Sequence, residues 1–392
     1  MISSHCLNAN LSGLGFGAMR LPLMPDGKTV DEAQVFEMTD YAIAGGITYF
    51  DTAYPYHGGQ SEIVLGRALG RHPRSSYCLA TKYPGHQIAS AYDPDQVFQD
   101  QLRKCGVEYF DFYLLHNVYE HSEKTYLDPA WGIVDYFREQ QRQGTIRHLG
   151  FSSHGSAAFL ERFLDRVDCM EFCQIQLNYL DWTLQDGAAK YELLTRRGMP
   201  IIVMEPVRGG RLARLSEQDE AVLRSFRPDE SPAAWCFRFL QDLPGVRVTL
   251  SGMSSMAQMV ENVETYRARR PLSKPELDAL LGIAAGMVDR VPCTGCRYCL
   301  SECPMGLDIP MLLSVYDELC FASQVTTTML VEGLPATKQP AACARCGACT
   351  RICPQGIDVP VLMEKLAEKL ATLPTWAQIC KQREAERLAN SQ

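Results

Sequence analysis

The stretch that decides the fold is Phe50-Asp51-Thr52-Ala53-Tyr54-Pro55-Tyr56, which follows Ile47 to Phe50, an apolar run typical of a buried strand. A carboxylate stands where this strand ends, and a phenol follows on the loop. Two further apolar runs end in the same way, at Lys82 and at His116. In a parallel barrel the carboxyl ends of neighbouring strands lie on one face, so these side chains can converge there.

An Asp, a Tyr, a Lys and a His in one place form a proton-transfer site. A phenol with an ordinary pKa of about 10 donates its proton poorly at neutral pH. A nearby ammonium favours the phenolate and lowers that pKa, and a carboxylate keeps the ammonium charged and in place. Taken singly, a strand-end Asp often caps a turn, and a strand-end Lys or His often reaches solvent. The set of four is what indicates chemistry.

With this set the chain resembles the aldo/keto reductase family, in Phe50-Asp51-Thr52-Ala53 with Tyr56, in Ala80-Thr81-Lys82 and in Leu114-Leu115-His116. The family has an α/β fold, a (β/α)8 TIM barrel, and reduces carbonyls with a nicotinamide cofactor. The resemblance covers roughly the first two-thirds of the chain. It implies Tyr56 as the general acid, Asp51 and Lys82 as the pair that tunes its pKa, and His116 as the group that orients the carbonyl.

The composition narrows the class of protein. A chain of 392 residues has room for a barrel and a smaller module. Its 38 Lys and Arg against 46 Asp and Glu give a net charge of -8, which disfavours nucleic acid or an anionic membrane as a partner. No apolar run approaches the roughly 20 residues of a membrane span, and Met1 to Cys6 lacks a signal-peptide pattern. We therefore expect a cytoplasmic protein.

The family resemblance also implies a set of residues for the nicotinamide cofactor. Ser152 and Gln174, at two further strand ends, match positions that hold the carboxamide, and Met204 stands where many members place an aromatic ring. After the strand Val246 to Leu250, a glycine turn opens a helix, which is a ready anion site. The adenosine end would be held there by Gly252, Ser254, Gln258 and Asn262.

The charged residues near these positions bear on which cofactor binds. No Lys or Arg occupies the candidate 2′-phosphate positions, which favours NADH over NADPH. Arg208 could still supply such a charge, or it could pair with Glu205 and simply close the loop. Arg20 could meet a phosphate or a substrate carboxylate, or form a surface salt bridge. A barrel can also hold a flavin phosphate, so a flavin stays among the candidate cofactors.

Past Arg290 the chain repeats itself. The pattern Cys-x2-Cys-x2-Cys-x3-Cys-Pro occurs twice, and each copy continues into a matching segment, Gly306-Leu-Asp-Ile-Pro310 and Gly356-Ile-Asp-Val-Pro360. Sixteen cysteines in a chain without a signal peptide indicate bound metal rather than disulfides. Zinc sites usually use two Cys-x-x-Cys pairs, which disfavours zinc. The spacing resembles that of two-cluster ferredoxins.

In such ferredoxins the cysteine before proline ligates the other cluster. The resemblance therefore implies two 4Fe–4S clusters, one held by Cys293, Cys296, Cys299 and Cys353 and the other by Cys343, Cys346, Cys349 and Cys303. We expect a barrel over residues 1–288 and a small, mainly helical, ferredoxin-like domain over residues 289–392.

Two functions follow. The first is hydride transfer between a nicotinamide and a small carbonyl or alcohol, in a chain that also carries an iron–sulfur electron-transfer module. The alternative is an electron-transfer or docking protein whose barrel no longer reduces carbonyls, and the absence of an aromatic residue at Met204 motivates it. The clusters could be structural staples, or a relay that serves a redox protein partner or a flavin.

Overall fold

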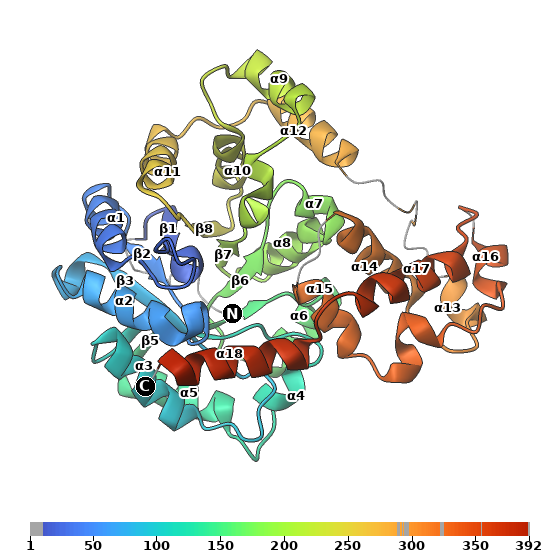
Figure 1. Cartoon of the computed structure of the whole chain (residues 1–392), viewed down its shortest axis with the longest axis horizontal. Helices are drawn as coiled ribbons and strands as arrows, with labels where there is room; N and C mark the ends of the chain where they lie inside the picture. Colours follow the sequence, from blue (N-terminus) through green and yellow to red (C-terminus); the bar gives the residue numbers. More distant parts are fainter. Residues whose placement is uncertain are drawn as a thin grey trace. The chain divides into compact units, whose positions relative to one another are not determined.

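A computed structural model describes residues 11–287, 291, 293, 298–321, 325–353 and 355–390. Strands β1 to β8 form a closed barrel, in which each strand pairs in parallel with its neighbours in sequence and β8 pairs with β1. The predicted α/β barrel is confirmed (Figure 1). The strands are β1 (Leu14–Gly17), β2 (Tyr49–Asp51), β3 (Cys78–Tyr83), β4 (Phe110–Leu115), β5 (Ile146–Ser153), β6 (Cys173–Gln176), β7 (Ile201–Met204) and β8 (Val246–Ser251).

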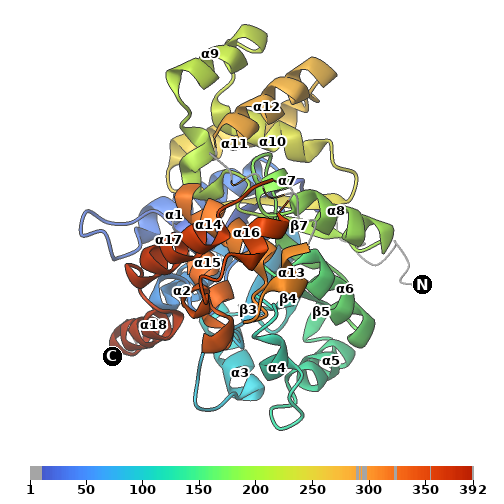
Figure 2. The same ribbon diagram turned by 90° about the vertical axis from the view of Figure 1, so that its right-hand side faces the viewer.

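Helices follow the strands and surround the barrel (Figures 1 and 2). The α-helices are α1 (Glu32–Ala44), α2 (Gln60–Leu69), α3 (Pro94–Cys105), α4 (Glu123–Tyr126), α5 (Ile133–Gln143), α6 (Ala157–Arg166), α7 (Asp181–Leu184), α8 (Gly187–Arg196), α9 (Glu217–Phe226), α10 (Pro232–Gln241), α11 (Met256–Ala268) and α12 (Lys274–Gly286). Short 3-10 segments are η1 (Ala18–Arg20), η2 (Tyr56–Gly59), η3 (Arg74–Ser76) and η4 (Arg208–Ala213).

Strand β2 begins at Tyr49, two residues after the start of its apolar run at Ile47. Side chains explain this, because the backbone N–H of Ser12 donates to Thr48 Oγ1 at 2.9 Å and that of Thr48 donates to Ser12 Oγ at 2.9 Å. These bonds take the place of ladder bonds ahead of β1 and β2. Ser and Thr often divert the backbone from regular structure in this way. Aspartates cap two of the helices: Asp31 accepts from Gln34 N at the start of α1, and Asp93 accepts from Gln96 N at the start of α3.

The barrel interior is filled by side chains and by close backbone contact. Its core includes Tyr49, Ala80, Phe112, Leu114, Phe172, Ile202, Val248 and Leu250, all buried. Gly15 of β1 faces this core, and a Cβ added there would lie only 2.8 Å from Val248 Cγ1. Side chains of β8 and β2 therefore occupy the space that a larger residue would need at this glycine. A filled interior leaves the chemistry to the carboxyl ends of the strands.

The chain divides into two compact units. The first contains the barrel, residues 1–182 and 186–280, together with residues 383–392, and the second contains residues 183–185 and 281–382. The second unit is mainly helical, as predicted. The remaining elements are α13 (Tyr298–Glu302), α14 (Ile309–Phe321), α15 (Val325–Glu332), η5 (Ala336–Lys338), η6 (Pro340–Ala342), α16 (Ala348–Ile352), α17 (Val359–Ala371) and α18 (Trp376–Asn390). The predicted boundary at residue 288 stays a prediction.

The sequence repeat of the second unit is also a repeat of structure. Each Cys-Pro motif runs into a glycine with positive φ, Gly306 at 58° and Gly356 at 63°, whose N–H donates to the carbonyl of the cysteine three residues earlier. An aspartate then caps the next helix, Asp308 for α14 and Asp358 for α17. The apolar residues on either side of each aspartate are buried. The repeat therefore encodes a turn, a cap and an anchor, twice.

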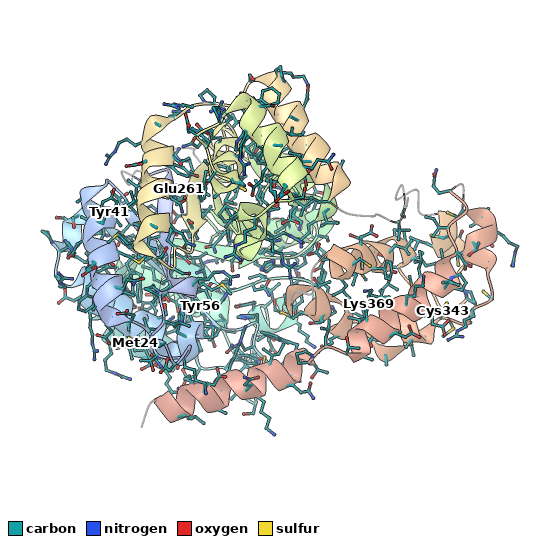
Figure 3. The ribbon with its side chains drawn as sticks, turned by 45° about the horizontal axis from the view of Figure 1, so that its top comes forward. Met24, Tyr41, Tyr56, Glu261, Cys343 and Lys369 are labelled. Carbon is teal, nitrogen blue, oxygen red and sulfur yellow. The ribbon has the colours of Figure 1, made fainter. Side chains whose placement is uncertain are left out.

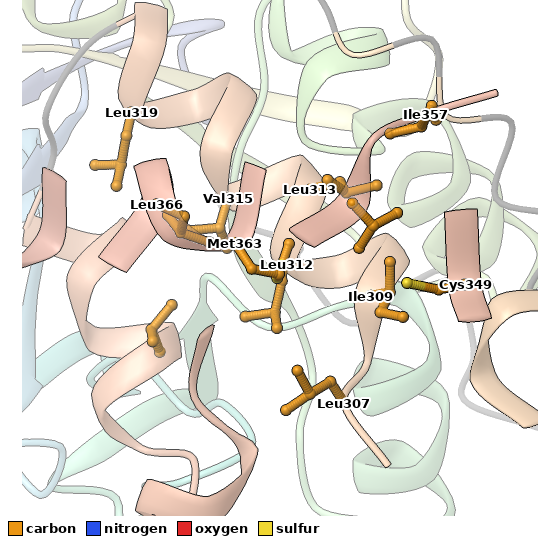
Figure 4. Close-up of a cluster of buried hydrophobic side chains, with 12 residues drawn as sticks. Leu307, Ile309, Leu312, Leu313, Val315, Leu319, Cys349, Ile357, Met363 and Leu366 are labelled. Atoms are coloured by element: carbon orange, nitrogen blue, oxygen red, sulfur yellow. The ribbon is translucent and has the colours of Figure 1, made fainter. Parts of the chain in front are cut away.

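Helices α14 and α17 pack against one another and supply most of the core of this unit (Figure 4). Its buried members include Leu312, Leu313, Met363 and Leu366, and the cysteines Cys293, Cys299, Cys303, Cys343 and Cys353 pack against it. Over the part of the chain that the structure describes, no helix has the length and apolarity needed to cross a membrane.

Candidate functional site

Asp51 and Lys82 form a buried ion pair at the ends of β2 and β3. Lys82 Nζ lies 2.5 Å from Asp51 Oδ1 and donates a second bond of 2.8 Å to the carbonyl of Thr52. Both side chains are almost fully buried. Burial works to lower the pKa of Lys82, but the combined attraction of Asp51 and Tyr56 raises it. Lys82 is therefore a charged ammonium at neutral pH.

The Tyr56 ring lies beside this ammonium. Tyr56 opens η2, where its backbone N–H donates to the Ala53 carbonyl at 3.1 Å, and Lys82 Nζ is 5.1 Å from the ring centroid. The His116 ring meets it edge-on, with 5.8 Å between centroids. The four residues predicted from the strand ends are therefore brought together, and Tyr56 is labelled in Figure 3. Their roles in a reaction stay predictions.

Burial shapes the protonation of this group. It raises the pKa of Tyr56 above the ordinary value, although the Lys82 ammonium opposes the rise. The sequence predicted that Lys82 lowers the pKa of Tyr56. It did not predict that burial raises this pKa by more. Burial, helped by the basic residues His86 and Lys82, holds the pKa of His116 well below the ordinary value. The site thus presents a neutral phenol and a neutral imidazole side by side.

A buried polar network, missed from the sequence, supports the strand that carries Lys82. Gln101 of α3 donates to Glu62 Oε1 at 2.7 Å and to the Lys82 carbonyl at 3.1 Å. Thr81 donates to the same Glu62 oxygen at 2.7 Å. Glu62 and Gln101 are fully buried. Gln101 is buried on α3 beside Phe98 and Cys105, because it completes this network.

The residues predicted to contact the nicotinamide lie on β5, β6 and β7, and two of them, Ser152 and Gln174, are those predicted to hold its carboxamide. Gln174 donates to Met204 Sδ at 3.6 Å, while its Oε1 is buried with no hydrogen-bond partner among the described residues. Ser152 Oγ accepts from Asn117 N at 2.8 Å. A buried amide oxygen without a donor is costly. A carboxamide N–H₂ would satisfy it, so these residues fit a nicotinamide.

The predicted adenosine end lies where β8 enters α11. Ser254 donates to the Arg20 carbonyl at 2.7 Å, and its own N–H donates to Gln258 Oε1 at 2.8 Å. Asn262 donates to Ser251 Oγ at 3.1 Å. A Cβ added to Gly252 would lie 3.2 Å from Arg20 Cβ, so a side chain there would crowd the arginine. Ser255 Oγ accepts from the N–H of Gln258 at 3.4 Å and caps the first turn of α11.

The loop after β7 differs from one of its two predicted forms. Glu205 faces Arg20, with 3.4 Å between Arg20 Nη2 and Glu205 Oε1, rather than closing the loop with Arg208. Arg208 is buried and pairs with Asp181 at 3.2 Å. Gln176 and Asn178 donate to the same carboxylate. Arg208 is therefore part of a buried structural network around the Asp181 carboxylate. No local sequence pattern indicates this network.

The structure also places three residues near the site that the strand pattern does not single out. His86, on the loop after β3, is buried, and its ring is tilted by 54° against the His116 ring with 4.3 Å between centroids. His154 follows β5, and burial lowers its pKa to about 3. After burial, the charge of Arg383 contributes to the lowered pKa of both His86 and His116. Gly85-His86 at a strand end is a usable signal for the first. No sequence signal indicates Arg383, because it lies beyond the cysteine motifs, far from the barrel strands in the sequence.

The cysteine repeat places thiols from both motifs around one cavity. It is lined by Cys303 of the first motif and by Cys343, Cys346 and Cys349 of the second, together with apolar side chains. This mixture is what the predicted crossover requires, so the residues fit a cluster. Cys296 lies outside the described residues. Among those described, no three His, Cys, Asp or Glu side chains converge tightly enough to hold a single metal ion.

Comparison with known proteins matches both units. The family model described as the aldo/keto reductase family matches residues 13–284, and one described as a 4Fe-4S dicluster domain matches residues 292–357. The uncharacterized oxidoreductase YqkF of Bacillus subtilis is 24% identical over 69% of this chain and 92% of its own length. Protein tas of Escherichia coli is 26% identical over 65% and 89%.

A solved structure gives the same result for the fold. The holo form of aldo-keto reductase AKR11C1 from Bacillus halodurans is 26% identical and covers 70% of this chain and 92% of its own, with a TM-score of 0.57.

Proposed function

Because the chain belongs to the aldo/keto reductase family and is an oxidoreductase, we propose that it transfers hydride reversibly between a nicotinamide cofactor and a small carbonyl or alcohol substrate. The observation that carries this proposal is the contact of Tyr56 with Lys82 and His116 at the carboxyl end of the barrel. A bound nicotinamide would supply or accept the hydride. The chain's own residues handle the proton.

Tyr56 acts as the general acid. In the direction of reduction its hydroxyl gives a proton to the substrate oxygen, and the Lys82 ammonium stabilises the phenolate that remains. Asp51 keeps Lys82 charged and fixes its position through the 2.5 Å contact. His116, held neutral by burial, donates a hydrogen bond that orients the carbonyl oxygen toward Tyr56. Burial of the whole set strengthens each of these interactions.

For the cofactor we propose contacts from Ser152, Gln174 and Met204 to the nicotinamide end and from Gly252, Ser254, Gln258 and Asn262 to the adenosine end. We also propose NADH over NADPH. A 2′-phosphate needs charge-assisted partners to offset its desolvation. Arg208 is buried against Asp181 and is not available for that task. Titration of the protein with each cofactor by fluorescence tests this, and equal or tighter binding of NADPH contradicts it.

For the second unit we propose two 4Fe–4S clusters, with Cys303 and Cys353 exchanged between the motifs, and a redox rather than a purely structural role. The matching dicluster family and the cavity that joins Cys303 to the second motif support this. A nicotinamide moves two electrons and a cluster moves one. A flavin or a partner redox protein would therefore link the two, in the cytoplasm where thiols stay reduced.

Substitution of Tyr56 tests the hydride-transfer proposal. Tyr56→Phe should lower kcat for NADH-dependent reduction of a carbonyl panel by about 10²- to 10⁴-fold, because it removes the general acid and leaves the ring. Tyr41→Phe, at a tyrosine on α1, serves as the control. A loss smaller than about tenfold would remove Tyr56 from this role.

The second candidate function is an electron-transfer or docking protein whose barrel does not reduce carbonyls. Met204 favours it, because a thioether packs against a nicotinamide with less specificity than an aromatic ring does. This candidate predicts no binding of NADH or NADPH to the anaerobically purified protein. A saturable fluorescence titration with either cofactor would exclude it.

A further inference from the structure

The two cysteine motifs share a spacing but not a charge. The second motif, residues 343–354, contains two arginines and no acidic residue. The first motif, residues 293–304, contains Arg297 and Glu302, whose formal charges cancel. The reduction potential of an iron–sulfur cluster depends on the charge around it and on hydrogen bonds to its sulfurs. The difference in charge therefore bears on how easily each proposed cluster is reduced.

Arg351 of α16 contacts the loop that carries the exposed cysteine of the second motif. Its Nη1 donates to the carbonyl of Cys346 at 3.3 Å. A Cβ added to Gly347 would lie 3.5 Å from the same nitrogen. The guanidinium therefore lies against the turn that follows Cys346. At the corresponding position of the first motif the sequence has Ser301, which carries no charge.

Lys338 of η5 contacts a second loop of the same cavity, the turn that follows Cys303. Its Nζ donates to the carbonyl of Met305 at 2.6 Å and lies 2.6 Å from the place of a Cβ added to Gly306. The repeated turn after the other motif differs, because a Cβ added to Gly356 would have no such neighbour within 4 Å among the described residues. The ammonium is therefore a feature of one copy of the turn.

Both cations act on one set of four thiols. Met305 and Cys346, whose carbonyls they contact, line the cavity that also contains Cys303, Cys343 and Cys349. Glu302 is the acid in the described lining, so two cations face one carboxylate. Arg345 adds little, because it pairs with Glu364 at 2.7 Å. A cluster bound by four thiolates is negative, and reduction adds another negative charge, so a surplus of nearby cations favours the reduced form.

We propose that Lys338 and Arg351 raise the reduction potential of the cluster held by Cys303, Cys343, Cys346 and Cys349 above that of the other cluster, so that it is the first to be reduced. The N–H of Leu307, which donates to Cys303 Sγ at 3.4 Å, acts in the same direction. The inference rests on the two proposed clusters and adds the order in which they accept electrons from a redox protein or a reduced flavin.

A redox titration of the full chain, purified without oxygen and followed by electron paramagnetic resonance, tests this order. The protein should show two one-electron transitions, and Cys303→Ser should lack the one at higher potential. Lys338→Gln and Arg351→Gln should each lower the higher potential, by about three- to tenfold in the one-electron equilibrium constant, which is at most about 59 mV. Lys338→Arg keeps the charge and should keep the potential. Lys365→Gln, which removes an exposed charge from α17, serves as the control.

Iron analysis separates this inference from the proposed clusters. About eight iron atoms per chain in the unmodified protein and in a glutamine variant show that both clusters are assembled. Unchanged potentials, or a shift confined to the lower transition, then overturn the inference and leave the clusters intact. Arg351 is exposed, so its variant should assemble even if Lys338→Gln does not. An unmodified protein without iron would remove the clusters and the inference together.

Discussion

The two units hold their functional groups in opposite ways. In the barrel, Asp51 and Lys82 are buried at the ends of hydrogen-bonded strands, and a second layer of Glu62, Thr81 and Gln101 supports them. In the second unit the cysteines that the structure describes lie on short turns and helices around a small core, and Cys346 is exposed. A buried charge lowers stability and needs a large fold around it. A thiolate set contributes stability only when its metal is bound.

Removal of Lys82 should produce the largest change. Lys82→Met leaves Asp51 buried without its partner, and we expect about 3–5 kcal/mol of lost unfolding free energy. We also expect kcat to fall at least about 10²-fold. Lys124→Met, at an exposed position on α4, should change neither. Urea unfolding and steady-state kinetics provide the two measurements.

A double variant sharpens this result. Asp51→Leu combined with Lys82→Met removes both charges, so stability should return while activity should not, because a buried ion pair replaced by apolar residues is often neutral. If the double variant is as unstable as the single one, the unpaired Asp51 charge is not what destabilises Lys82→Met.

The cysteines of the second unit should respond as crossed pairs. Cys303→Ser should remove the cluster of Cys343, Cys346 and Cys349, because all four line one cavity. Cys353→Ser should remove the other cluster. Each variant should keep about half of the iron of two 4Fe–4S clusters. Electron paramagnetic resonance of the reduced protein distinguishes which cluster is lost. If each variant loses the cluster of its own motif, the crossover is wrong.

The support behind Lys82 should matter less than Lys82 itself. Gln101→Leu removes the donor to Glu62 and to the Lys82 carbonyl, and it leaves Glu62 Oε1 with one fewer hydrogen bond in a buried place. We expect about 1–3 kcal/mol of lost stability. Gln96→Leu, on an exposed position of the same helix, is the matched control. Equal stability of the two variants would show that the network is incidental.

Sequence patterns were sufficient where the physical cause is local. The apolar run Phe110 to Leu115 is β4 without adjustment, the cap at Asp31 starts α1, and the repeat at Gly306 and Gly356 forms the same turn twice. The four strand-end residues converge because parallel strands end on one face. In each case a few neighbouring residues determine the outcome.

Sequence patterns failed to predict which polar residues are buried when their partners lie far away in the sequence. Gln101 is buried because Glu62 needs a donor, and Arg208 is buried because Asp181 needs a cation. Neither partner is near in sequence. The contact of Arg387 with the Tyr54 ring likewise joins residues that are far apart in the sequence. Positive φ at Glu205, 55°, and at Arg208, 48°, is likewise set by the network around them.

The smallest expected effect is the pH dependence of stability that His86 causes. It should appear in the barrel and not in the second unit. His86 is 7% exposed, and burial followed by the charge of Arg383 lowers its pKa to about 3, whereas an unfolded histidine has a pKa of about 6.5. Between these values the unfolded chain binds a proton that the folded chain does not. This contribution to stability is therefore complete above about pH 7 and is lost as the pH falls toward 3, by at most about 1.4 kcal/mol per pH unit.

His86→Asn should flatten the acid side of the stability curve by up to that slope, and the two proteins should run parallel above pH 8. Urea unfolding of the barrel between pH 4.5 and 8.5, followed by tyrosine and tryptophan fluorescence, measures it. All eight histidines lie before residue 155, so unfolding of the second unit, followed by cluster absorbance, should lack this histidine-linked slope. An acid side that His86→Asn leaves unchanged would mean that His86 accepts its proton in the folded protein. The lowered pKa of His86, and the burial and Arg383 charge that cause it, would then be contradicted.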